Sequence, residues 1–116
     1  RKCDFLIALS QEALKKYLKD LKENGKLIVD SNYVRVTLED FEQKLYSLPF
    51  CKFAREKFGN EIFANVIVLG FLAGMFHLVS EESLRKAVIS SVPSKYKKEN
   101  VEALSLGVKL AEEQEG

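Results

Sequence analysis

Few side chains that could do chemistry occur in this chain of 116 residues, and their spacing forms no catalytic group. His77 is the only histidine, and no G-x-S-x-G turn brings a serine nucleophile to it, so we interpret it as a helix-end or interface residue. The two cysteines, Cys3 and Cys51, lie far apart and outside any CxxC or Cys/His cluster. No P-loop or G-x-G-x-x-G motif is present. The sequence therefore predicts no catalytic residue and no metal ligand, and it assigns no residue to a cofactor.

The charged clusters have simpler interpretations than catalysis. Glu81-Glu82 stands at a predicted helix start and Glu112-Glu113 in a charged tail, where the helix dipole and solubility explain both pairs. The segment 95–98 places three lysines around a tyrosine and could touch a phosphate, but the acidic residues that follow favour a solvated helix start. The formal net charge is only +1. We therefore expect neither nucleic acid nor an anionic membrane as a partner.

The segment 62–79 is apolar except for Asn65, its glycines and His77. Its length approaches that of a membrane span, and Gly70 and Gly74 form the G-x-x-x-G pattern of packed membrane helices. The polar residues inside it and the lack of a basic flank favour a buried helix in a soluble protein instead. The glycines would then permit close approach of another backbone.

Three residues of this helix are candidates for a subunit interface: Asn65, Gly70 and Gly74. An amide inside a buried helix costs about 1–3 kcal/mol unless it finds hydrogen-bond partners. Asn65 therefore either bonds within its own domain or faces another subunit, and the sequence leaves both interpretations open.

The first half of the chain predicts alternating strands and helices. An apolar run at 5–9 indicates a buried strand, a helix follows from Ser10 to Asn24-Gly25, and a second strand covers 26–30. We expect short strands near 34–36 and 45–48 with a helical turn between them.

The second half predicts helices only. These helices cover 50–58, 62–79, 81–91 and a final segment from about 100 that dissolves into the charged tail 112–116. With 47% hydrophobic residues the chain can form one core, so we predict a single domain over residues 1–116. The expected fold class is α/β: a three-layer α/β/α domain with a partial, mainly parallel sheet and a helical C-terminal segment.

The order of several motifs resembles the gamma subunit of 2-oxoacid:ferredoxin oxidoreductases. The resemblance begins with DFLIALSQEAL at 4–14 and GKLIVDS at 25–31. It continues in the segments Phe58-Gly59-Asn60, Ala64-Asn65, Leu69–Leu72, Ser80–Val92 and Asn100–Gly107. The later segments are similar to the long central helix and the C-terminal helices of that family, so the resemblance covers nearly the whole chain.

The resemblance implies a part in the oxidative decarboxylation of a 2-oxoacid, such as pyruvate or 2-oxoglutarate, to its acyl-CoA with reduction of ferredoxin. It implies thiamine diphosphate, iron–sulfur clusters and coenzyme A for the whole complex, with none of them bound by this chain. Its partners would be the other subunits of the oxidoreductase, and the chain would be a non-catalytic accessory subunit. The resemblance leaves open which 2-oxoacid is used.

The chain departs from the family pattern at its start, and this departure leads to further predictions. The strand and Gly-rich turn that open the family domain do not precede Asp4, so the chain resembles about the C-terminal two thirds of a gamma domain. A sheet that lacks strands exposes an edge, which predicts a homo-oligomer for the isolated chain. The low cysteine content indicates a cytoplasmic protein. The alternative from another class is a stand-alone protein-interaction module without an enzymatic role.

Overall fold

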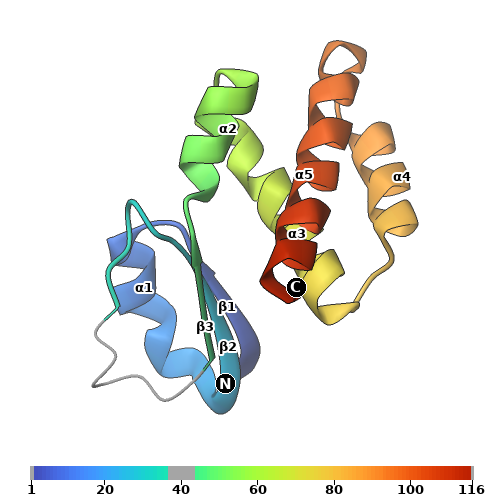
Figure 1. Ribbon diagram of the computed structural model, residues 1–116. Coiled ribbons are helices and arrows are strands. Elements are labelled where there is room, and N and C mark those ends of the chain that lie inside the picture. Colours follow the sequence, from blue (N-terminus) through green and yellow to red (C-terminus); the bar gives the residue numbers. More distant parts are fainter. Residues whose placement is uncertain (1, 37–43, 116) are drawn as a thin grey trace. The chain divides into compact units, whose positions relative to one another are not determined.

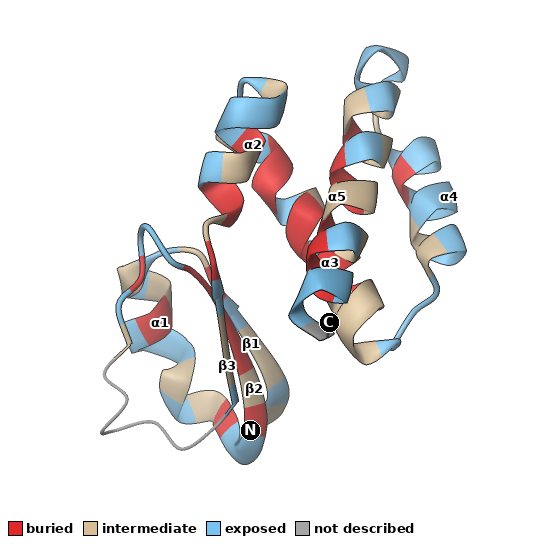
Figure 2. Cartoon of the chain, viewed as in Figure 1, coloured by how far each residue is buried: buried red, intermediate tan, exposed pale blue. Residues whose placement is uncertain are grey.

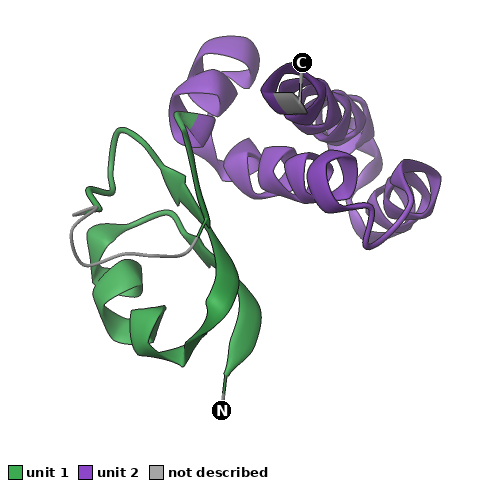
Figure 3. Cartoon of the chain, turned by 60° about the horizontal axis from the view of Figure 1, so that its bottom comes forward, with its two compact units in different colours: residues 1–49 green, residues 50–116 purple. Residues whose placement is uncertain are grey.

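The computed structural model describes residues 2–36 and 44–115 and divides the chain into two compact units, Arg1–Pro49 and Phe50–Gly116 (Figure 3). The predicted fold class is confirmed, because a partial parallel sheet is followed by a helical C-terminal segment. That residues 1–116 form a single domain stays a prediction, and each unit is described by itself.

Over its described residues, the first unit is a small parallel sheet with one α-helix (Figure 1). Its described elements are β1 (Cys3–Ala8), α1 (Gln11–Tyr17), the 3-10 turn η1 (Leu18–Asp20), β2 (Leu21–Asp30) and β3 (Lys44–Leu48). The strand order is β1-β2-β3, and Ile28 of β2 lies between Ile7 of β1 and Tyr46 of β3. Among the described residues, β1 and β3 are therefore the edges of the sheet.

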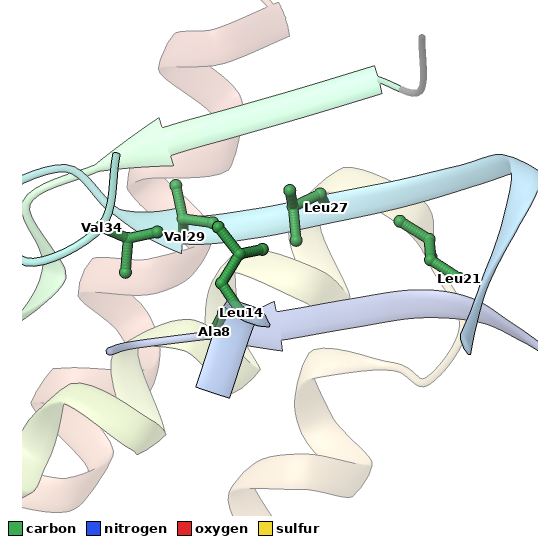
Figure 4. Packing of buried hydrophobic residues seen from close by; sticks show 6 residues of the cluster. All are labelled: Ala8, Leu14, Leu21, Leu27, Val29 and Val34. Atoms are coloured by element: carbon green, nitrogen blue, oxygen red, sulfur yellow. The ribbon is translucent and has the colours of Figure 1, made fainter. Parts of the chain in front are cut away.

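The core of this unit lies between β2 and α1. Leu27 and Val29 alternate along β2 toward the same face of the sheet, and Leu14 of α1 packs against them (Figure 4). The cluster comprises Ala8, Leu14, Leu21, Leu27, Val29 and Val34. Burial of each larger apolar side chain contributes about 1.5–3 kcal/mol, so this cluster holds α1 on the sheet. Figure 2 shows the same pattern as buried positions along β2.

The first helix is shorter than predicted. It was expected to reach Asn24-Gly25, but α1 ends at Tyr17 and β2 already begins at Leu21. Leu21 fits the helical spacing of the preceding leucines, yet it is 4% exposed and enters the core from the strand. Between Leu21 and Lys26 the register of β2 against β1 shifts, and Gly25 lies inside this irregular stretch.

The predicted strand at 34–36 is wrong. The Val34 N–H donates to the Asp30 carbonyl at 2.9 Å, which turns the chain away from the sheet. The Gln11 side chain then accepts from the Arg35 N–H at 2.8 Å and donates to its carbonyl at 3.1 Å, replacing a strand partner. The strand predicted at 45–48 is confirmed as β3. The helical turn expected before it falls within 37–43, outside the described residues.

The second unit is helical throughout its described residues. Its elements are α2 (Phe50–Phe58), η3 (Glu61–Phe63), α3 (Ala64–Phe76), α4 (Glu81–Ser91), η4 (Ser94–Tyr96) and α5 (Lys97–Glu115). All four predicted helices are confirmed, but both ends of α3 and both ends of α5 differ from the prediction. α3 stops at Phe76 because His77 adopts a left-handed conformation, with φ 54°. α5 stays helical to Glu115, where a charged tail was expected, and its buried Leu110 and Ala111 hold this last part.

α3 and α5 form the centre of this unit. Phe71 and Ile67 of α3 and Leu104 of α5 are fully buried. Phe50 of α2 meets Phe71 edge to face with 5.4 Å between ring centroids, a geometry that aromatic pairs favour. Figure 2 shows the buried positions gathered where these helices face one another. Over the described residues, no helix combines the length and apolar character needed to cross a membrane.

Candidate subunit-interface surface

Of the three interface candidates on α3, Asn65 lies on the outer side, and Gly70 and Gly74 lie together on the side that faces α5. Asn65 is exposed, Gly70 is buried and Gly74 is half-buried. The interpretation of Asn65 as an internally bonded core amide is wrong, because its side chain lies at the surface. The placement of these residues at a subunit interface stays a prediction.

The outer side of α3 carries apolar residues around Asn65. Ile62 precedes Asn65 by three positions and Leu69 follows it by four, which is the spacing of one helix face. Ile62 is 65% exposed and Leu69 is 40% exposed. Large apolar side chains around a neutral amide resemble the centre of a protein interface more than an ordinary solvated face.

The inner side of α3 uses its glycines within the chain. A Cβ on Gly70 would lie 2.0 Å from the Leu104 carbonyl oxygen, and one on Gly74 would lie 2.7 Å from the Ala111 Cβ. Close approach of another backbone was predicted for these glycines and is confirmed, with α5 of the same chain as the partner. The sequence did not indicate which helix this would be.

A pocket of about 340 Å³ lies beside the end of α3. Its walls are Ala73, Gly74, His77, Val79, Ser80, Glu81 and Val108. Ser80 is the N-cap of α4, and its hydroxyl accepts from the Ser83 N–H at 3.0 Å. The Glu81 carboxylate pairs with Arg85 at 2.9 Å. These polar groups serve the start of α4, and the prediction that His77 stands at a helix end is confirmed.

Sequence reasoning missed the exposed apolar connection between α3 and α4. Leu78 is 61% exposed and Val79 is 46% exposed. The signal was present, because two apolar residues stand directly before the N-cap Ser80, where a connecting loop is normally polar. They were instead counted as the last turn of the apolar helix.

The basic segment before α5 is a projecting turn. Pro93, Ser94, Lys95 and Tyr96 are all exposed, and the Lys95 ammonium lies 5.0 Å from the centroid of the Tyr96 ring. Lys97 and Lys98 follow in the first turn of α5. Figure 1 shows this connection between α4 and α5 at one end of the helical unit.

The residues of this chain do not fit an iron–sulfur cluster. Such clusters are held by four thiolates, or by thiolates with histidines, and the sequence contains two cysteines and one histidine. Cys3 lies in β1 of the first unit and Cys51 in α2 of the second. Within residues 2–36 and 44–115, no three side chains of the metal-binding types form a group that could hold an ion.

Comparison with known proteins identifies the class to which this arrangement belongs. Residues 1–110 match the family model described as pyruvate ferredoxin/flavodoxin oxidoreductase. The chain belongs to this family. Its relatives with curated names are separate subunits, and the chain spans about 60% of the length of those that it matches.

Particular relatives are similar over nearly the whole chain. The 2-oxoglutarate synthase subunit KorC of Methanocaldococcus jannaschii is 37% identical over 113 residues, covering 97% of this chain and 60% of that protein. The keto/oxoacid ferredoxin oxidoreductase gamma subunit of Geobacter sulfurreducens superposes with a TM-score of 0.86 and 37% identity, over 94% of this chain and 64% of that chain. The 2-oxoglutarate:ferredoxin oxidoreductase of Magnetococcus marinus, solved with 2-oxoglutarate, coenzyme A and succinyl-CoA bound, shares the fold. Its TM-score is 0.79 at 20% identity, over 97% of this chain and 20% of that chain.

Proposed function

We propose that this chain is part of the gamma subunit of a 2-oxoacid:ferredoxin oxidoreductase and acts there as a non-catalytic accessory component. The observation that carries the proposal is the family match over residues 1–110, together with 37% identity to a gamma subunit of the same fold. The reaction of the complex would be oxidative decarboxylation of a 2-oxoacid. Its carboxylate leaves as CO₂, its acyl group forms a thioester with coenzyme A, and its electrons pass to ferredoxin.

The substrate that we propose is 2-oxoglutarate. The curated relatives from Methanocaldococcus jannaschii and Methanothermobacter thermautotrophicus, 37% and 36% identical, are both named 2-oxoglutarate synthase subunits. A pyruvate oxidoreductase subunit of Thermotoga maritima shares the fold at 21% identity, so fold alone does not separate the two substrates.

The cofactors of the reaction would be held by other subunits. Thiamine diphosphate supplies the carbanion chemistry of decarboxylation, and iron–sulfur clusters carry the electrons. The two cysteines in separate units support this division of labour, since this chain offers no cluster ligands. Its own contribution would be surface for assembly, and the exposed apolar side chains around Asn65 support such a role.

Two further features belong to the proposal. We place the complex in the cytoplasm, where free thiols and low-potential iron–sulfur clusters persist. We also expect the isolated chain to form homo-oligomers, because β1 and β3 are open edges among the described residues and Leu78 and Val79 are exposed. Light scattering after size exclusion tests this, and a clean monomer at micromolar concentration would exclude it.

The function is tested by purification through a tag on this chain under anaerobic conditions. The eluate is assayed for reduction of a viologen dye that depends on both a 2-oxoacid and coenzyme A, with 2-oxoglutarate and pyruvate compared. Activity with 2-oxoglutarate alongside larger partner subunits supports the proposal. Recovery of other proteins without this activity would favour a stand-alone interaction module.

A further inference from the structure

We propose that the turn formed by Ser94–Lys98 is a docking site for an acidic surface on another subunit of the oxidoreductase. The proposal rests on the proposed function, because it names where part of that assembly contact lies. It is carried by the charge, exposure and position of Lys95 and Lys98 around Tyr96.

One stretch of the chain carries positive charge only. From Ser83 to Lys98 the sequence contains five cationic residues and no Asp or Glu, although the net charge of the whole chain is +1. Two of these cations are neutralised inside α4, where Arg85 pairs with Glu81 and Lys86 with Glu82. The described residues provide no ion-pair partner for the three lysines of the turn. Within this stretch, the unneutralised charge is therefore gathered at Ser94–Lys98.

The lysines at the start of α5 destabilise this helix. The amino end of a helix carries partial positive charge, so carboxylates stabilise the first turn and ammonium groups oppose it. The first turn of α5 nevertheless carries Lys97 and Lys98 beside Glu99. Residues that break a local rule of stability are expected where a surface serves another purpose.

The shape of the turn favours a macromolecular partner. Pro93 to Tyr96 are all exposed in a projecting 3-10 turn, whereas small molecules bind in concave pockets. Tyr96 is 40% exposed and lies beneath the Lys95 ammonium. Tyrosine is enriched at the energetic centres of protein interfaces, and a lysine held over its ring presents its charge in a defined place. A carboxylate-bearing protein surface complements this combination.

The test compares two charge-reversal pairs in the full chain. Lys95→Glu with Lys98→Glu alters the turn, while Lys52→Glu with Lys109→Glu makes the same change in net charge at exposed positions on α2 and α5. Affinity for the purified remaining subunits of the oxidoreductase is measured by biolayer interferometry. The turn variant should bind about tenfold or more weakly, because opposed charges become like charges, and the control pair should bind as wild type does. The difference should shrink between about 0.05 M and about 0.5 M NaCl as the charges are screened.

Thermal unfolding separates docking from a structural role. The turn variant should unfold at the same or a higher temperature than wild type, since Lys98→Glu matches the helix dipole. Weaker binding without lost stability supports the docking site. Unchanged binding by the turn variant, or equal weakening by both pairs, would overturn it. Loss of affinity for a single-stranded oligonucleotide with subunit binding intact would instead indicate a nucleic-acid site and also overturn it. If wild type fails to bind the subunits at all, the proposed function itself is refuted.

Discussion

Gly70 of α3 and Gly107 of α5 face each other backbone to backbone. A Cβ on Gly107 would lie 2.9 Å from the Gly70 Cα, 1.9 Å from the Ile67 carbonyl oxygen and 2.6 Å from the Phe71 nitrogen. Because all three neighbouring atoms belong to helical backbone, neither helix can give way without moving as a whole. The central helix pair therefore depends on the absence of a side chain at both positions.

Substitution of Gly107 by alanine should destabilise the helical unit strongly. Overpacking against rigid backbone costs about 1–3 kcal/mol and occasionally more, and we expect the upper end of this range here. The free energy of unfolding is measured by urea denaturation. Ser105→Ala, a half-buried change on the same helix, is the control and should have little effect. Equal stability of Gly107→Ala and wild type would contradict the α3–α5 packing.

The substitution His77→Gly should stabilise the chain. His77 has φ 54° at the C-cap of α3, and a left-handed conformation costs a residue with a Cβ about 1–2 kcal/mol. Glycine also has greater conformational freedom in the unfolded chain, which offsets part of this gain. We therefore expect the free energy of unfolding, measured by thermal denaturation, to rise by about 0.5–1 kcal/mol. Glu102→Gly, inside α5, should instead lower the free energy of unfolding by about 1 kcal/mol. A destabilised His77→Gly would mean that the imidazole makes stabilising contacts.

Removal of the Asp30 carboxylate should destabilise the sheet. Asp30 is fully buried at the end of β2, and its Oδ1 accepts from the Asn32 N–H at 2.9 Å. Asp30→Ala leaves this donor without its partner, at a cost of about 1–3 kcal/mol, while Asp30→Asn keeps an acceptor and should cost less.

Asp4 provides the matched comparison for Asp30. Its pair with Lys22, at 3.0 Å, is largely solvent-exposed, so Asp4→Ala should cost under about 1 kcal/mol in the same denaturation experiment. If Asp4→Ala and Asp30→Ala proved equally mild, the chain reversal after β2 would not depend on the buried carboxylate.

The Gln11 side chain should protect the segment after β2 from hydrogen exchange. It bonds both the N–H and the carbonyl of Arg35, which lies outside any strand. Gln11→Ala should speed exchange at the Arg35 amide markedly, while exchange within β2 stays slow because the ladder with β1 is intact. Amide exchange followed by NMR measures both. Unchanged exchange at Arg35 would show that other contacts hold this segment.

Local sequence signals located most elements but not all of their ends. Apolar runs identified β1 and β2, and Ser10 marked the start of α1 correctly. The end of α1 was misplaced because Leu21 satisfies helical spacing and strand burial equally well. Its pairing with Cys3 of β1 decides between them, and that contact is not local.

Identification of the candidate site from the sequence was limited in the same way, because contacts between distant residues are not visible in a local pattern. Asn65 lies in an apolar run, and periodicity in a helix that is apolar on all sides does not tell which side faces outward. The packing of α3 against α5 determines that side. Gly70 contacts Gly107 of α5, and Asn65 therefore lies at the surface. The lysines at 95–98 were found from the sequence, but their projection from an exposed turn required the structure.

The most direct test of the central claim is anaerobic purification through a tag on this chain, with wild type, Ser105→Ala and Gly107→Ala compared. The measured quantity is dye reduction that requires both 2-oxoglutarate and coenzyme A, per amount of tagged chain recovered. We predict equal activity with wild type and Ser105→Ala, and loss of both activity and partner subunits with Gly107→Ala, because assembly needs the folded helical unit. Partner proteins that are recovered with wild type but show no 2-oxoacid-dependent activity would contradict the assignment to a 2-oxoacid:ferredoxin oxidoreductase.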